Sequence, residues 1–170
     1  MTGERVIAHE MTHQWFGNSV TPINWEEIWL NEGFATYGEL IWTAHEDGPQ
    51  SAQAMVRQWY QSRALEERGA ADRAQPPGVV QPSTMFNRVV YERGALTLHA
   101  LRMRVGDELF FQILQTYAKR FAYDNVATAD FTALAEEVSG QELDDLFTAW
   151  LYEQPLPDIP EAGLFRSDFQ

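Results

Sequence analysis

The stretch that decides the fold is GERVIAHEMTHQWFG, residues 3–17. Its apolar residues recur at spacings that suit one buried face of a helix, and Gly17 suits a C-terminal stop; the apolar residues are Val6, Ile7, Met11 and Phe16. His9 and His13 lie one turn apart on this helix, a separation from which two imidazoles can converge on one metal ion. Glu10 projects to the side of the same face, where it can take a proton from a water at the metal.

A second amphipathic helix, over residues 26–45, supplies a third ligand. It contains EEIWLNEGFATYGELIW and follows a turn over residues 18–24. An antiparallel helix pair places Glu32 opposite the two histidines, and two histidines with one glutamate form the ligand set of open catalytic zinc sites. Structural zinc sites are usually closed by four ligands and rich in cysteine, and this chain has no cysteine. The sequence therefore predicts one Zn²⁺ per chain, held by His9, His13 and Glu32.

Three further polar residues are interpreted as follows. Glu39 lies seven residues after Glu32 on the same helix face, where it is either a solvated glutamate or the acceptor for the second N–H of a liganding histidine. His45 is interpreted as a solvated residue at a helix end. His99 is interpreted as structural, with a place in the cleft as the alternative.

These motifs carry a resemblance to a known family. His9-Glu10-x-x-His13, followed by Glu32 inside NEGFA, resembles the signature of the gluzincin metallopeptidases. VIAHEMTHQWFGN together with WLNEGFATY is similar to the aminopeptidase N family in particular. VVYERGALTLHALR is similar to the family segment whose tyrosine stabilises the tetrahedral intermediate, and that tyrosine maps onto Tyr91. FTAWLYEQPLPDIP resembles the end of that family's catalytic domain, so the resemblance runs from residue 6 to residue 157.

The resemblance implies a fold and an activity. The expected fold is mainly α: the helical subdomain of a thermolysin-like zinc metallopeptidase catalytic domain, with the zinc site between two helices. Residues 1–157 would form this subdomain, and residues 158–170 a C-terminal tail or a linker to a following domain. The expected reaction removes N-terminal residues from peptides, with Glu10 as general base for zinc-activated water and Tyr91 as oxyanion stabiliser.

One departure from the family pattern limits this expectation. The family has an upstream Gly-x-Met-Glu-Asn motif, on a mixed α/β lobe, that binds the substrate's α-amine, and no such stretch occurs here. We therefore expect a piece of a catalytic domain that has low activity alone and self-associates through the face that the lobe would cover. The alternatives are a non-catalytic zinc-binding interaction fragment, or an endopeptidase or epoxide hydrolase on the same scaffold. The upstream sequence of the parent chain would distinguish them.

Composition narrows the class of protein. The chain has 170 residues, of which 45% are hydrophobic, enough for the core of one domain. A formal net charge of −13 argues against nucleic acid as a partner, and charges interrupt every apolar stretch before it reaches the length of a membrane span. We expect peptide substrates as partners. Absence of cysteine is compatible with a reducing compartment, so the predicted location is cytoplasmic.

The rest of the chain reads as further helices without strand alternation. They are expected over residues 51–69, 86–105, 107–122, 128–138 and 143–152. Asp107 and Thr128 are predicted N-caps, and Gly140 is a predicted helix stop. The connection over residues 70–83 is rich in proline and glycine and is either a plain surface linker or an edge of the cleft; because it leads directly into the segment with Tyr91, we favour the cleft edge.

Overall fold

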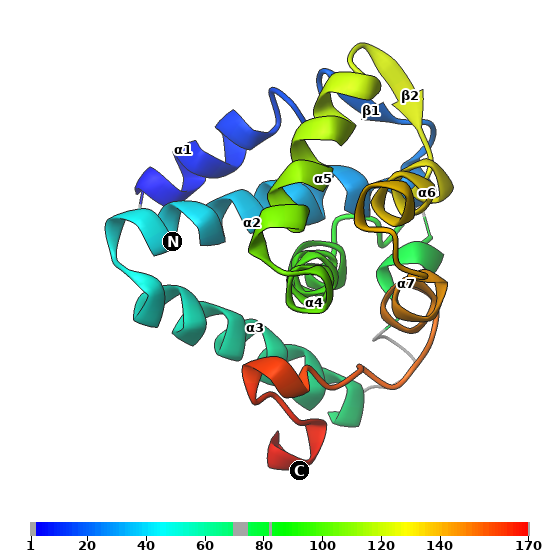
Figure 1. Ribbon diagram of the computed structural model, residues 1–170. Coiled ribbons are helices and arrows are strands. Elements are labelled where there is room, and N and C mark those ends of the chain that lie inside the picture. Colours follow the sequence, from blue (N-terminus) through cyan, green and yellow to red (C-terminus); the bar gives the residue numbers. More distant parts are fainter. Residues whose placement is uncertain (1–2, 70–74, 82, 170) are drawn as a thin grey trace.

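Seven α-helices form most of the part of the chain that the structure describes (Figure 1), and the prediction of a mainly α fold is confirmed. The computed structural model describes residues 3–69, 75–81 and 83–169. The helices are α1 (Gly3–Thr12), α2 (Trp29–Glu46), α3 (Pro49–Gly69), α4 (Gly94–Val105), α5 (Asp107–Arg120), α6 (Thr128–Ser139) and α7 (Asp144–Leu151).

Several short elements escaped the sequence analysis. Strand β1 (Val20–Pro22) pairs in parallel with β2 (Asp124–Val126), with Thr21 opposite Asn125. Strands of three residues are too short to show an alternating pattern. A 3₁₀ turn (Trp25–Glu27) precedes α2, and one turn of π-helix (Val89–Arg93) precedes α4, so the single helix predicted from residue 86 is divided.

Helix α4 is the centre of the core and is seen end-on in the middle of Figure 1. It packs on α2, α3, α5 and α7. Because neighbours surround it, apolar residues occupy all its sides, as expected for a buried helix. Leu96, Leu98 and Leu101 have no exposed surface.

An aromatic cluster joins α2 to α5 and α6. The Phe131 ring meets the rings of Phe34 and Tyr117 edge-to-face, at centroid distances of 5.1 and 4.9 Å. The Trp29 indole N–H donates to the Thr128 hydroxyl at 2.7 Å. The Thr128 hydroxyl is therefore engaged in a tertiary contact. Thr128 was the predicted N-cap of α6, but it is the first residue of the helix, and the N-cap is Ala127.

The N-terminus of α5 differs from the prediction, whereas the C-terminus of α6 agrees with it. Gly106 is the N-cap of α5, and Asp107, the predicted N-cap, is instead its first residue and binds Arg102 through two hydrogen bonds of 2.8 Å. Gly140 ends α6 in the left-handed conformation, as predicted.

The apolar side of α1 does not form the predicted buried face. Val6, Ile7 and Met11 are 42%, 59% and 56% exposed, and the helix ends at Thr12 rather than Gly17. The reason is that α1 turns its smaller and polar residues toward α2; those residues are Ala8, His9, Thr12 and His13. Self-association through this exposed face stays a prediction.

Residues after α7 pack on α3. The Tyr60 hydroxyl donates to the Pro157 carbonyl at 3.0 Å, and Phe169 packs its ring on Tyr60 with 5.8 Å between centroids. Whether residues 158–170 lead to a following domain stays a prediction. Of the connection over residues 70–83, residues 70–74 and 82 lie outside the described residues. Its 3₁₀ turn (Pro77–Val79) lies against the end of α7, where Gly78 meets Tyr152.

No helix within the described ranges has the length and apolar character needed to cross a membrane.

Candidate metal centre and catalytic cleft

Close packing of α1 on α2 brings the predicted ligands together. The two helices approach closely at Gly38, where a β-carbon would lie 2.1 Å from the Thr12 hydroxyl oxygen. A side chain at this position would push the helices apart, so glycine sets their separation. Thr12 lies between His9 and His13 in the sequence, and the contact therefore fixes the depth at which both histidines face α2.

His9, His13 and Glu32 form one compact cluster. The Nε2 atoms of His9 and His13 lie 3.3 and 3.5 Å from Oε2 of Glu32. One ligand atom from each residue falls within 4.8 Å of the others, and no second such cluster occurs in the described part of the chain. Two imidazole nitrogens and one carboxylate oxygen at this separation fit Zn²⁺, which binds both atom types at about 2.0–2.2 Å.

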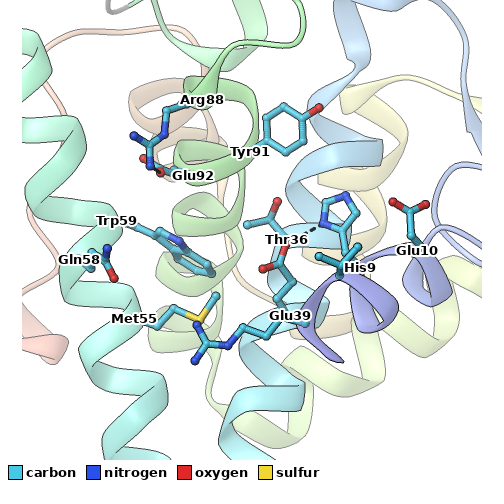
Figure 2. Close-up of a pocket in the computed structure, with 12 residues that line it drawn as sticks. His9, Glu10, Thr36, Glu39, Met55, Gln58, Trp59, Arg88, Tyr91 and Glu92 are labelled. Carbon is cyan, nitrogen blue, oxygen red and sulfur yellow. Dashed lines mark hydrogen bonds and ion pairs between the residues drawn. The ribbon is translucent and has the colours of Figure 1, made fainter. Parts of the chain in front are cut away.

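Hydrogen bonds on the far side of each imidazole orient the cluster. His9 Nδ1 donates to Oε1 of Glu39 at 2.8 Å, the dashed line in Figure 2, and His13 Nδ1 donates to the Phe16 carbonyl at 3.2 Å. With Nδ1 carrying the proton, Nε2 of each ring is the free ligand atom.

The charged groups of the cluster shift one another's pKa values. Burial disfavours a charge on His9, but Glu32 and Glu39 outweigh it and raise the pKa of His9 to about 9. The hydrogen bond to Glu32 raises the pKa of His13. Burial disfavours the Glu32 carboxylate, yet the two histidines lower the pKa of Glu32 to about 2. The site therefore attracts positive charge, and a bound cation takes the place of these protons.

Glu10 and Tyr91 lie beside this cluster. Glu10 is exposed and rises from α1 next to His9 (Figure 2). The Tyr91 ring stacks near the His9 ring, with centroids 6.2 Å apart and planes at 22°. Burial, followed by the charges of Glu32 and Glu10, raises the pKa of the Tyr91 phenol, so its hydroxyl keeps its proton as a donor.

A close backbone contact brings Tyr91 to the cluster. A β-carbon on Gly33 would lie 3.0 Å from backbone atoms of Gly94, so α2 touches the start of α4 directly. Glu32 directly precedes Gly33, and Tyr91 lies three residues before Gly94.

A cleft of about 660 Å³ opens beside the cluster, between α1, α2, α3 and the π-helix. Its lining contains His9, Glu10, Glu39 and Tyr91, together with residues that the sequence analysis missed; these are Arg5, Val6, Thr36, Met55, Gln58, Trp59, Arg88 and Glu92. The Thr36 hydroxyl is buried in this wall without a hydrogen-bond partner. Its position, four residues after Glu32, is the signal that could have found it. The α3 residues carry no such signal, because only tertiary packing brings them here.

The two remaining histidines lie elsewhere. His45 is exposed at the end of α2, near Glu46. His99 is partly buried, with Nδ1 3.4 Å from the Tyr37 hydroxyl, and it does not line the cleft.

Comparison with known proteins agrees with this fold. Residues 2–150 match the model of the peptidase family M1 domain. The chain therefore belongs to peptidase family M1.

Its relatives are longer proteins. Rice (Oryza sativa subsp. japonica) aminopeptidase M1-C is 35% identical over 90% of this chain, and aminopeptidase N of Streptomyces lividans is 34% identical over 85%. A mutant M1 zinc metallopeptidase from Deinococcus radiodurans, solved with a Tyr-Ser-Ala substrate, superposes with a TM-score of 0.80 at 38% identity. That match covers 95% of this chain and 35% of the other. This chain spans 18% of the length of both aminopeptidases.

Proposed function

We propose that the chain carries the zinc-binding part of an aminopeptidase active site, in which His9, His13 and Glu32 hold one Zn²⁺. The observation that carries the proposal is the convergence of these three side chains beside Glu10 and Tyr91, next to a cleft of about 660 Å³ that His9, Glu10 and Tyr91 line. The names of the M1 relatives support peptide substrates and removal of N-terminal residues.

Each residue has a distinct chemical task. When bound, zinc supplies Lewis-acid polarisation and makes water acidic enough to react near neutral pH. Glu10 accepts the proton of the attacking water and returns it to the leaving amine, because its carboxylate is free of the ligand set. The Tyr91 hydroxyl donates a hydrogen bond to the oxyanion that develops on the scissile carbonyl. Glu39 keeps His9 in the orientation that its role as ligand requires.

This assignment explains features that a structural zinc site does not need. A closed structural site has four protein ligands and no adjoining cleft. Here three ligands converge, and a carboxylate and a phenol stand beside them at a cleft wall. An interaction fragment that only binds zinc gives no role to Glu10 or Tyr91.

The test combines metal analysis with an assay. We expect one zinc per chain by elemental analysis, and ligand distances of about 2.0–2.2 Å by anomalous scattering and crystallography. Glu32→Gln should lose zinc, whereas His45→Ala, a histidine on the same helix, should retain it. The longest natural chain that contains these residues should hydrolyse aminoacyl-amides, and that activity should disappear with Glu32→Gln. Metal that stays bound in Glu32→Gln, or a zinc-loaded chain without hydrolysis, would contradict the proposal.

A further inference from the structure

The turn that carries Tyr91 is unusual. It is a single turn of π-helix, Val89–Arg93, an element that is rare and is frequently found at functional sites. Four of its five residues are buried, and Tyr91 is the one that lies partly exposed at the cleft. Since π-geometry is less favourable than α-geometry, contacts from outside the turn must hold it in place.

Two ion pairs tie this turn to α3. The Glu92 carboxylate lies 2.7 Å from Nε of Arg63, and Nη1 of Arg93 donates to Oε1 of Glu67 at 3.1 Å. Arg63 and Glu67 are one helical turn apart on α3. Glu92 and Arg93, which follow Tyr91, thus meet residues of opposite charge on α3. Because the two pairs have opposite polarity, shifting the π-turn along α3 would bring like charges together.

The residues of these pairs are largely removed from water. Arg93, Arg63 and Glu92 are 1%, 4% and 7% exposed. Arg93 also donates to the carbonyls of Ala149 and Trp150 at 3.1 and 2.8 Å, near the C-terminus of α7, where a cation is favoured.

The Arg63–Glu92 contact depends on charge. These two groups are close but lack the alignment of a hydrogen bond, so electrostatic attraction dominates their contact. Glu92 has a second partner, the exposed Arg88, at 2.8 Å.

Buried ion pairs add little net stability compared with apolar residues of similar volume, but removing one partner leaves an uncompensated charge. Their effect here is on geometry. We infer that Arg63 and Glu67 are positioning residues, which act through Glu92 and Arg93 to hold the Tyr91 hydroxyl at the metal cluster. This inference rests on the proposed function, since it gives Tyr91 the role of oxyanion donor. It makes α3 a determinant of the turnover rate as well as a wall of the cleft.

The first test is a double-mutant cycle on Arg63 and Tyr91, measured as aminoacyl-amide hydrolysis by the longest natural chain. Tyr91→Phe should lower kcat by about 10²–10³-fold, the usual effect of removing one oxyanion donor. Arg63→Met should lower kcat by about 10-fold or more and leave KM within about threefold, because the oxyanion forms after substrate binds. In the Tyr91→Phe background Arg63→Met should have no further effect, because residues that act through each other are not additive.

Controls separate positioning from general damage. Glu66→Gln removes the exposed partner of Arg63 on the same helix and leaves the Arg63–Glu92 contact, so kcat should not change. Arg63→Lys keeps the charge and should recover most of the activity. If Arg63→Met lowers kcat by the same factor with and without the Tyr91 hydroxyl, Arg63 acts through stability alone and the inference is wrong.

A second measurement does not depend on activity. In the 170-residue chain the Tyr91 and His9 rings should give nuclear Overhauser contacts, as their 6.2 Å centroid distance requires. Arg63→Met should weaken these contacts and Glu66→Gln should not. If Arg63→Met does not fold, Glu92→Gln, which keeps the shape of the side chain, replaces it. Unchanged ring contacts in a folded variant overturn the inference. Loss of the contacts in a chain without hydrolysis supports the positioning and refutes only the proposed function.

Discussion

At the scale of single residues, the histidine pair shows how hydrogen bonds orient the metal-binding site. Each imidazole donates through Nδ1, His9 to Glu39 and His13 to the Phe16 carbonyl, and each therefore presents Nε2 to Glu32. The ring orientations are set by groups that do not take part in the reaction. Binding a metal then requires little rearrangement, which favours affinity.

Glu10 gives the first prediction at this scale. Glu10→Gln should retain one zinc and lose about 10²–10⁴-fold in kcat, the usual contribution of a general base, because its side chain is a neighbour of the ligands rather than one of them. Zinc content and aminoacyl-amide turnover are measured on the same preparation. Glu4→Gln, an exposed glutamate on the same helix, is the control and should change neither. Stoichiometric loss of zinc, with unchanged turnover of the remaining holoenzyme, would show that the base is assigned wrongly.

The second prediction at this scale concerns His99 and the pH dependence of the free energy of unfolding. Burial, with a smaller effect from Arg102, lowers the pKa of His99 from 6.5 to about 4. Between these values the unfolded chain binds more protons, so the free energy of unfolding falls as pH drops from 6.5 to 4. The loss is about 3 kcal/mol, at 1.36 kcal/mol for each unit of pKa. Above pH 6.5 His99 has no such effect.

The measurement is denaturant unfolding of the metal-free protein at several pH values. His99→Phe should show a flatter profile between pH 6.5 and 4, and His45→Gln, which alters an exposed ring, should follow the wild-type slope. Equal slopes for wild type and His99→Phe would contradict the prediction. Comparing slopes rather than absolute stabilities removes the contributions of the other titrating groups.

At the scale of elements, the contact between α2 and α4 decides which side chains can meet. The two helices touch at Gly33 and Gly94, and this contact places the residues next to them, Glu32 and the turn with Tyr91, on one side of the crossing. Larger residues would separate the helix axes, since packed helices with ordinary side chains lie 8–10 Å apart.

Gly33→Ala should therefore destabilise the protein, although alanine is the better helix former. Its β-carbon would lie 3.0 Å from the Gly94 backbone, which cannot rotate away as a side chain could. Overpacking of this kind costs about 1–3 kcal/mol, measured by chemical denaturation. Gly69→Ala, at a helical glycine with free space around it, should be neutral or slightly stabilising. A Gly33→Ala variant as stable as wild type, with unchanged activity, would show that the contact does not limit the crossing.

The arrangement of the elements also explains which parts of the site could be predicted from the sequence and which could not. The ligand cluster lies within two local motifs, where spacings of four and seven residues on a helix fix which side chains share a face, and His9, His13, Glu32 and Glu39 do meet. The π-turn was missed because distant charges on α3 hold it. The buried face of α1 was predicted wrongly because periodicity shows that a face is apolar but not which neighbour covers it.

At the scale of the whole molecule, α1 is the least enclosed helix of the site. None of its residues is fully buried, and it packs chiefly on α2. Yet it carries His9, and His13 follows directly after its end. A metal held by these residues and by Glu32 ties α1 to the rest of the protein.

Zinc should therefore protect α1 more than any other helix. We expect hydrogen exchange of the α1 amides to slow strongly on zinc addition, while exchange in α4 changes little, because local opening follows local stability. Equal protection of α1 and α4 would show that zinc stabilises the fold globally rather than through α1.

The small contact of Gly38 with Thr12 then has a reciprocal effect. If the metal holds α1 against α2, then by thermodynamic linkage anything that holds α1 against α2 strengthens metal binding by the same factor. Gly38 contacts none of the proposed ligands. A substitution at Gly38 should nevertheless weaken zinc binding, because the packing of α1 on α2 and the binding of the ion are thermodynamically coupled. We therefore expect that removing the metal with a chelator loosens α1 selectively, and that a change which loosens the packing of α1 on α2 lowers metal affinity.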